Sequence, residues 1–249
     1  MRVADIEALQ RLVGCDKPLV AQKLHTIEPT LPCVPVDPID DRPHHPDSEQ
    51  WIEQWQFDFW SPEHDLGGWI HFTHDPTSKQ GWYVAALVGV DRPLVLVVDP
   101  ELRITDLSPY LEFRAEGIWA QHVCETPLSH WTIGLEAFGV TLDDPADALG
   151  NQWGKRTGVG LDVEWESNTD PQETDDGFTQ QCCVTGEVLI DEETIDLNTK
   201  GSRCRSWGRS PEGSEKDPLP LAIAIQVGDH VLEIEFDSSL GQWHGGLRM

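Results

Sequence analysis

The sequence has little positive charge. Only 17 lysines and arginines stand against 44 aspartates and glutamates, so the formal net charge is -27. Phosphate backbones and anionic lipid headgroups repel a chain of this charge. We therefore expect neither nucleic acid nor a membrane surface as a partner. The acidity itself fits a salt-rich habitat or a means of staying soluble, and it does not bear on the fold.

Long hydrophobic runs are also missing. No stretch of about 18 apolar residues occurs, and the segment from Met1 to Leu12 contains Asp5, Glu7 and Gln10, unlike a signal peptide. We therefore expect a cytoplasmic protein. The six cysteines show no CxxC spacing, which argues against a disulfide framework and against a zinc site. All six are predicted to be reduced.

Several sequence motifs of known chemistry are absent. There is no GxGxxG, no P-loop and no GxSxG. The histidine pairs His71/His74 and His122/His130 do not have a spacing that is diagnostic of a metal site. The acidic loop 170–176 lacks the glycine and the terminal glutamate of a calcium loop. The sequence therefore predicts no cofactor and no metal.

The first 48 residues predict a helix followed by an extended arm. Ile6, Leu9 and Val13 recur at helical spacing. Prolines then occur at every third position from Pro29 to Pro38, which matches the turn of a polyproline helix. Residues 1–48 are thus interpreted as an N-terminal helix and a Pro-rich arm.

The rest of the chain has the pattern of β-strands. Trp55, Phe57 and Phe59 alternate with polar residues, as in a half-buried strand. Similar segments separated by turn residues continue to about residue 140 and start again near Leu161. This predicts a mainly β protein of about a dozen antiparallel strands, in barrel or sandwich form. A loop at 143–150 suggests two β domains, 49–150 and 151–249.

Tryptophan is unusually frequent, with eleven residues against two tyrosines. Indoles on β-strands either fill a core or line a cavity for an apolar or polyene ligand, and both interpretations stay open. The candidate ligand-binding residues are Trp55, Phe57, Trp82, Trp119, Trp131, Phe138, Trp165, Arg203, Arg205 and Trp207.

Three segments carry a family resemblance: WQFDFWSP from Trp55 with LGGWI from Leu66, HWTIGLEAFGV from His130, and GSRCRSWGR from Gly201. In this order they resemble actinobacterial-type proteins related to carotenoid 1,2-hydratase (hydroxyneurosporene synthase) and the AttH-like group. The resemblance spans Trp51 to Arg209. It implies two lipocalin-like β domains with a hydrophobic site. It also implies hydration of isolated double bonds or, as in related fungal proteins, cycloaddition of polyenes.

One motif departs from that family. Relatives carry Asp-His-Ser-Trp-Gly where this chain has Cys204, Arg205, Ser206, Trp207 and Gly208. Hydration of an alkene needs a proton donor, and a histidine can supply the proton near neutral pH. Arginine cannot, because it does not titrate in that range. If the chemistry depends on these positions, it has been lost or moved.

Other residues are candidates for the missing acid. Glu136 shares a predicted strand face with Phe138 and Val140, where burial would raise its pKa and make it a proton donor. His122 and His130 flank a predicted turn and are further catalytic candidates. In the alternative interpretation Glu136 and the histidines are structural or point into solvent.

Arg203, Arg205 and Trp207 are predicted to share one strand face. The two guanidinium groups suit an anionic ligand group, held by bidentate hydrogen bonds. They equally suit pairing with some of the many carboxylates of this chain. Both alternatives stay open at the level of the sequence.

The leading functional hypothesis is a protein that binds an apolar small molecule (a polyene, terpenoid or polyketide) and promotes its cyclisation, isomerisation or hydration. A dry cavity would achieve this mainly by holding reactive carbons together. The alternative is a non-catalytic carrier or partner subunit without the Asp-His pair. A purely structural subunit is a third possibility, and association into a homo-oligomer stays open.

Overall fold

The computed structural model describes residues 36–48, 51–89, 91–104, 107, 110–142, 154–174, 176–209, 222–227, 230–237 and 242–248. The predicted N-terminal helix and the prolines up to Pro35 lie outside these ranges. The helical content of the described residues is one 3-10 turn, η1 (Pro38–Asp41), which Asp37 caps by accepting a hydrogen bond from the Ile39 amide at 2.9 Å. Within the same ranges, no helix is long and apolar enough to cross a membrane.

The mainly β prediction is confirmed. The strands are β1 (Trp51–Ser61), β2 (Leu66–Asp75), β3 (Gln80–Val88), β4 (Leu94–Arg103), β5 (Glu112–Ala115), β6 (Ile118–Thr126), β7 (His130–Leu142), β8 (Lys155–Ser167), β9 (Gln172–Thr174), β10 (Gly177–Ile190), β11 (Glu193–Arg209), β12 (Ala222–Val227), β13 (His230–Asp237) and β14 (Gln242–Arg248).

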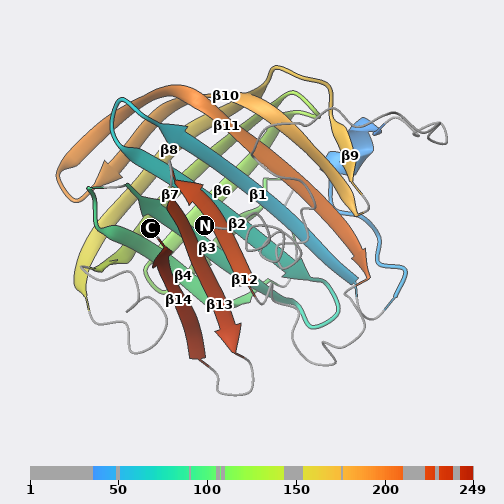
Figure 1. The fold of residues 1–249 in the computed structure, drawn as a ribbon. Coiled ribbons are helices and arrows are strands. Elements are labelled where there is room, and N and C mark those ends of the chain that lie inside the picture. Colours follow the sequence, from blue (N-terminus) through green and yellow to red (C-terminus); the bar gives the residue numbers. More distant parts are fainter. Residues whose placement is uncertain are drawn as a thin grey trace.

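Eight of these strands close into one antiparallel barrel (Figure 1). Their order is β1, β2, β3, β4, β7, β8, β10 and β11, with β11 returning to pair with β1. Apart from the insertion between β4 and β7 and the short β9, each strand pairs with the next along the chain, which is the up-and-down arrangement of lipocalins. Leu94–Leu96 of β4 pair with β7 and close the ring, whereas the rest of β4 has no strand paired on that side among the described residues.

The prediction of two barrel-like halves is corrected by this topology. Strands β1–β4 and β7, from the first predicted half, share the single barrel with β8, β10 and β11 from the second. The predicted boundary loop, 143–150, lies outside the described residues. On its two sides β7 and β8 pair continuously from His130 to Thr141. Period-two alternation identifies strands, but it does not say whether a strand pairs within its own half.

The hairpin of β5 and β6 completes the wall at one end of the barrel. The first part of β7 pairs with β6, from Thr126↔His130 to Ile118↔Ala137, whereas Val140 to Leu142 pair with β4. At the end where β7 begins, the hairpin therefore lies between β4 and β7. Elsewhere, β9 pairs with β10, and β12–β14 form a separate sheet whose first strand lies against β2 (Figure 1).

Two apolar clusters lie on opposite faces of the barrel wall. The larger cluster lies on the inside and includes Trp55, Phe57, Trp131 and Trp165. A smaller one lies outside, on β2, β3, β4 and β7, and consists of Trp69, Trp82, Val84, Ala86, Val88, Leu94, Leu96 and Leu142. β2 and β3 are consequently buried on both faces. The inside of the barrel is the place to look for a ligand site.

The four described cysteines, Cys124, Cys182, Cys183 and Cys204, are free. This agrees with the prediction of reduced thiols for these four. Cys15 and Cys33 lie outside the described residues.

Candidate functional site

One end of the barrel is closed by the segment 36–48, which carries a carboxylate into the interior. Asp41 on η1 receives two hydrogen bonds from Arg203 on β11, at 2.6 and 3.0 Å. Both side chains are almost fully buried, with 1% and 2% exposure. Arg203 also donates to Gln180, and the Leu128 amide donates to Asp41. This bidentate pair ties the segment to strands far away in the sequence.

A second buried ion pair joins Arg205 to Glu53 on β1. Glu53 also accepts hydrogen bonds from the Trp51 indole at 2.7 Å and the His44 amide at 2.9 Å. Burial raises the pKa of Glu53, but the bonding to His44 and the charge of Arg205 outweigh this and hold it below its ordinary value. Of the two sequence-level alternatives for the arginines, the structure places both in pairs with carboxylates.

Trp207 also lies at the closed end. Its ring stacks on His44, with centroids 4.3 Å apart and planes at 19°. The Arg205 guanidinium lies 4.1 Å from the centre of the Trp55 ring and 5.2 Å from that of Trp207. The three residues predicted to share a strand face therefore do so, and they face the segment 36–48. Their contacts stabilise the closed end by packing and cation–π attraction.

The middle of the barrel holds a histidine in an aromatic cage. His122 on β6 is fully buried, and its ring centre lies 5.7 to 6.2 Å from those of Phe57, Phe72, Tyr83 and Phe113. Neither ring nitrogen has a hydrogen-bond partner among the described residues. Burial lowers the pKa of His122 to about 3. The imidazole is thus neutral, with one donor and one acceptor unused.

Other polar atoms of this region are also unpaired. The Tyr83 hydroxyl is fully buried without a described partner, and burial raises its pKa above the ordinary value, so it stays a neutral phenol. The indole N–H groups of Trp55 and Trp131 also lack hydrogen-bond partners in the part of the chain that the structure describes. Trp165 differs, because its indole donates to the Asp58 carbonyl at 3.0 Å. Such a concentration of buried, unsatisfied groups is unusual and calls for an explanation.

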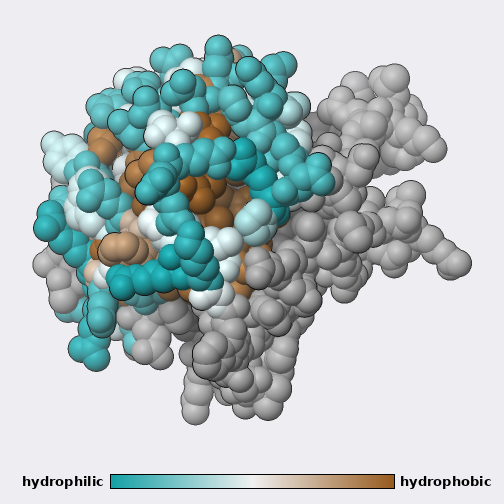
Figure 2. All heavy atoms as spheres, turned by 90° about the vertical axis from the view of Figure 1, so that its left-hand side faces the viewer, coloured by the Kyte–Doolittle hydropathy of each residue, from teal (hydrophilic) through white to brown (hydrophobic). Residues whose placement is uncertain are grey.

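The other end of the barrel is aliphatic and less covered. Ala137, Val159, Ile190 and Ile195, near the ends of β7, β8, β10 and β11, belong to or pack against the interior cluster. Val159 and Ile195 keep 4% exposure, and Ala137 keeps 9%, while His122 and its cage are buried more deeply on average. Figure 2 views this end and shows a hollow in which hydrophobic side chains are visible inside a hydrophilic rim. This end is the open one.

Some sequence-predicted site residues lie outside the barrel. Glu136 and Phe138 are exposed, and Phe138 lies against Arg156, whose guanidinium carbon is 3.9 Å from the ring centre. The burial on which the proposed acid role of Glu136 rested is therefore not found. Trp119 points away from the interior, and its ring lies beside Gly134 on the outer wall. Trp82 belongs to the outer cluster.

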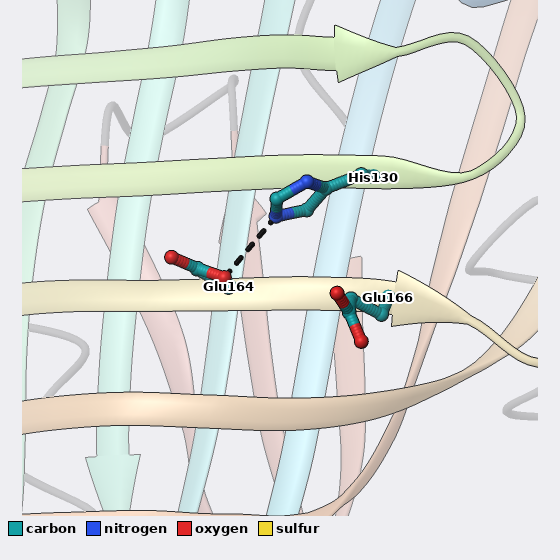
Figure 3. A group of neighbouring side chains, drawn as sticks. All are labelled: His130, Glu164 and Glu166. Carbon is teal, nitrogen blue, oxygen red and sulfur yellow. Dashed lines mark hydrogen bonds and ion pairs between the residues drawn. The ribbon is translucent and has the colours of Figure 1, made fainter.

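His130 lies on the outer wall with Glu164 and Glu166 from β8 (Figure 3). The nitrogen Nε2 of His130 is 3.2 Å from a Glu164 oxygen, and the potential ligand atoms of the three side chains lie within 4.8 Å of one another. All three are partly or fully exposed. Exposed groups of this kind are common on acidic proteins, and no buried polar atom supports a cation here, so this group carries no functional assignment.

Polar residues of the interior that the sequence analysis missed include Asp41, His44, Glu53 and Tyr83. Asp41 and His44 gain their partners only when the segment 36–48 closes the barrel, whereas Glu53 on β1 also pairs with Trp51 and with Arg205 on the neighbouring β11. Tyr83 lies in a strand that is apolar on both faces. The hydroxyl of a tyrosine within a continuous apolar strand was the only sequence signal for Tyr83.

Residues 37–214 match the family model DUF7064, a domain of unknown function. The chain belongs to the DUF7064 family. No curated protein matches the sequence.

Two crystal structures of CghA are distantly similar. The one determined with Sch210972 is 11% identical with a TM-score of 0.36, and the other is 13% identical with a TM-score of 0.34. In both cases the match covers 75% of this chain and 53% of CghA, so this chain matches about half the length of CghA. At these TM-scores the site has to be understood from its own residues.

Proposed function

We propose that this barrel binds an elongated apolar small molecule, which enters at the open end and extends towards the aromatic cage. The observation that supports this proposal is the difference between the two ends of the barrel interior. Aliphatic side chains line one end beneath a visible hollow (Figure 2), aromatic side chains line the middle, and paired charges close the other end. A deep apolar site with a few convergent polar groups is the usual form of a small-molecule site.

A binding role is favoured over hydration by the placement of the titratable groups. Among the described residues, the carboxylates buried inside the barrel are Asp41 and Glu53, and both are paired with arginine. Asp58, whose pKa burial raises to about 6, lies on the outer face of β1, where it accepts hydrogen bonds from Ser202. His122 is kept neutral by burial, while Glu136 lies on the outer wall. Protonation of a carbon needs an acid aimed at the substrate. This supports the carrier alternative. It also leaves room for cyclisation, which needs only that reactive carbons be held close together.

The test uses diphenylhexatriene, an apolar probe with no hydrogen-bonding group. Energy transfer from the barrel tryptophans to the bound probe reports its affinity. We expect saturable binding by the wild-type protein, and at least a 10-fold loss of affinity in Val159→Glu, because a charge at the open end opposes entry of an apolar molecule. Val159→Trp, which adds bulk without charge, should also weaken binding.

Thr185→Glu is the matched control. Thr185 is exposed on the outer side of β10, so the same charge there should leave probe affinity within about 2-fold of the wild type. Circular dichroism establishes that each variant is folded. Absence of saturable binding by the wild type, or wild-type affinity for the probe in folded Val159→Glu and Val159→Trp, would overturn the proposal.

A further inference from the structure

The unsatisfied polar groups in the middle of the barrel lie close together and on separate strands. His122 comes from β6 and Tyr83 from β3, and their ring centres are 5.8 Å apart. Both contact Phe113, at 5.7 and 4.9 Å between centroids. Each is completely buried. The fold thus brings two polar side chains together in a cage whose other members, Phe57, Phe72 and Phe113, are apolar.

Leaving these groups unpaired costs free energy. A buried donor or acceptor without a partner loses its hydration and gains nothing in exchange. Replacement of His122 by phenylalanine would remove this cost with little change in ring size. A polar pair held in such a place is best explained by a partner that is not part of the chain.

From these observations we propose that His122 and Tyr83 form a hydrogen-bonding subsite for a neutral oxygen group, a carbonyl or hydroxyl, on the apolar ligand. This inference rests on the proposed function and specifies the ligand class. The neutral imidazole offers one donor and one acceptor, and the phenol can donate and accept. A carbonyl or hydroxyl group can therefore bond to both side chains.

The same geometry disfavours a carboxylate. An ionised group at this depth needs a cation or several charge-assisted bonds. Arg203 and Arg205 are already paired with Asp41 and Glu53, and burial keeps His122 uncharged near neutral pH. A fatty-acid type of ligand would therefore bury its charge without compensation. The subsite selects neutral ligands over acids of the same skeleton.

The experiment compares three probes that share one polyene skeleton, retinol, retinal and retinoic acid, with diphenylhexatriene as the probe without polar groups. At pH 7.5 we expect retinol and retinal to bind at least 10-fold more tightly than retinoic acid. In His122→Phe and Tyr83→Phe, affinity for retinol and retinal should fall about 3- to 10-fold, the value of a neutral hydrogen bond. Affinity for diphenylhexatriene should stay within 2-fold.

Phe72→Leu is the matched control, because it alters the packing of the same cage without removing a polar atom. It should change the affinities for retinol and for diphenylhexatriene by the same factor. The subsite is disproved if the wild type binds retinoic acid as tightly as retinol and retinal. It is also disproved if His122→Phe and Tyr83→Phe lower the affinities for all four probes equally. In both cases the proposed binding function still stands. If no probe binds, the proposed function fails as well.

Discussion

The closed end and the middle of the barrel differ in how fully their buried polar groups are paired. At the closed end, Arg203 and Arg205 each pair with a carboxylate and donate to further acceptors, and only their Nε atoms lack a partner among the described residues. In the middle, His122 and Tyr83 have no described partner. Satisfied networks rigidify a fold, whereas unsatisfied ones lower its stability. The buried ion pairs favour a structural role for Arg203 and Arg205, and the unpaired His122 and Tyr83 are the better candidates for contact with a ligand.

The largest expected effect concerns the closed end. Arg205→Met leaves Glu53 buried without its cation, and we expect a loss of about 3 to 5 kcal/mol in the free energy of unfolding. Urea denaturation followed by tryptophan fluorescence measures it. The double variant Glu53→Leu/Arg205→Met removes both charges and should recover most of the loss. If Arg205→Met lowers the free energy of unfolding by less than about 1 kcal/mol, the ion pair does not stabilise the closed end as argued, and the two regions do not differ in this way.

A second prediction tests the middle of the barrel by pH. The pKa of His122 is lowered to about 3 by burial, from an ordinary value of 6.5. Below pH 6.5 the unfolded chain binds a proton that the folded protein does not, so stability falls as the pH falls. At about 1.4 kcal/mol per pH unit, this amounts to roughly 2 kcal/mol between pH 6.5 and pH 5. His122→Phe should reduce the pH dependence of stability by this amount.

The control for the pH experiment is His130→Asn, since His130 reaches solvent on the outer wall. Urea unfolding of the two variants and the wild type at pH 7.5 and pH 5 gives the comparison. An unchanged pH dependence in His122→Phe would show that the imidazole is hydrated or paired in solution, and would weaken the contrast with the closed end.

The smallest effect is expected outside the barrel. Glu136→Gln changes an exposed side chain on β7, so the free energy of unfolding should move by less than about 0.5 kcal/mol. Affinity for diphenylhexatriene, measured by energy transfer, should stay within 2-fold. A large loss of probe affinity would show that Glu136 belongs to the ligand site and that the ligand binds on the outer wall.

Local pattern was sufficient for much of the interior. The alternation in β1 predicts that Trp55 and Phe57 share a buried face, and they do. Trp131 and Trp165 follow from the same rule on β7 and β8. The prediction succeeds because a strand places successive side chains on opposite faces whatever its partners are. The shared face of Arg203, Arg205 and Trp207 follows in the same way.

What the sequence determined by itself was therefore the β class, most of the strands and, where residues alternate, the face of each side chain. Tertiary structure alone decided that one barrel forms, because the β4–β7 and β1–β11 pairings join distant segments. It also decided that Trp82 lies outside and Tyr83 inside, because β3 is apolar on both faces. The partners of Arg203 and Arg205 lie 162 and 152 positions away. Period-two alternation is a local property, whereas pairing between distant strands and charges depends on how the whole chain closes.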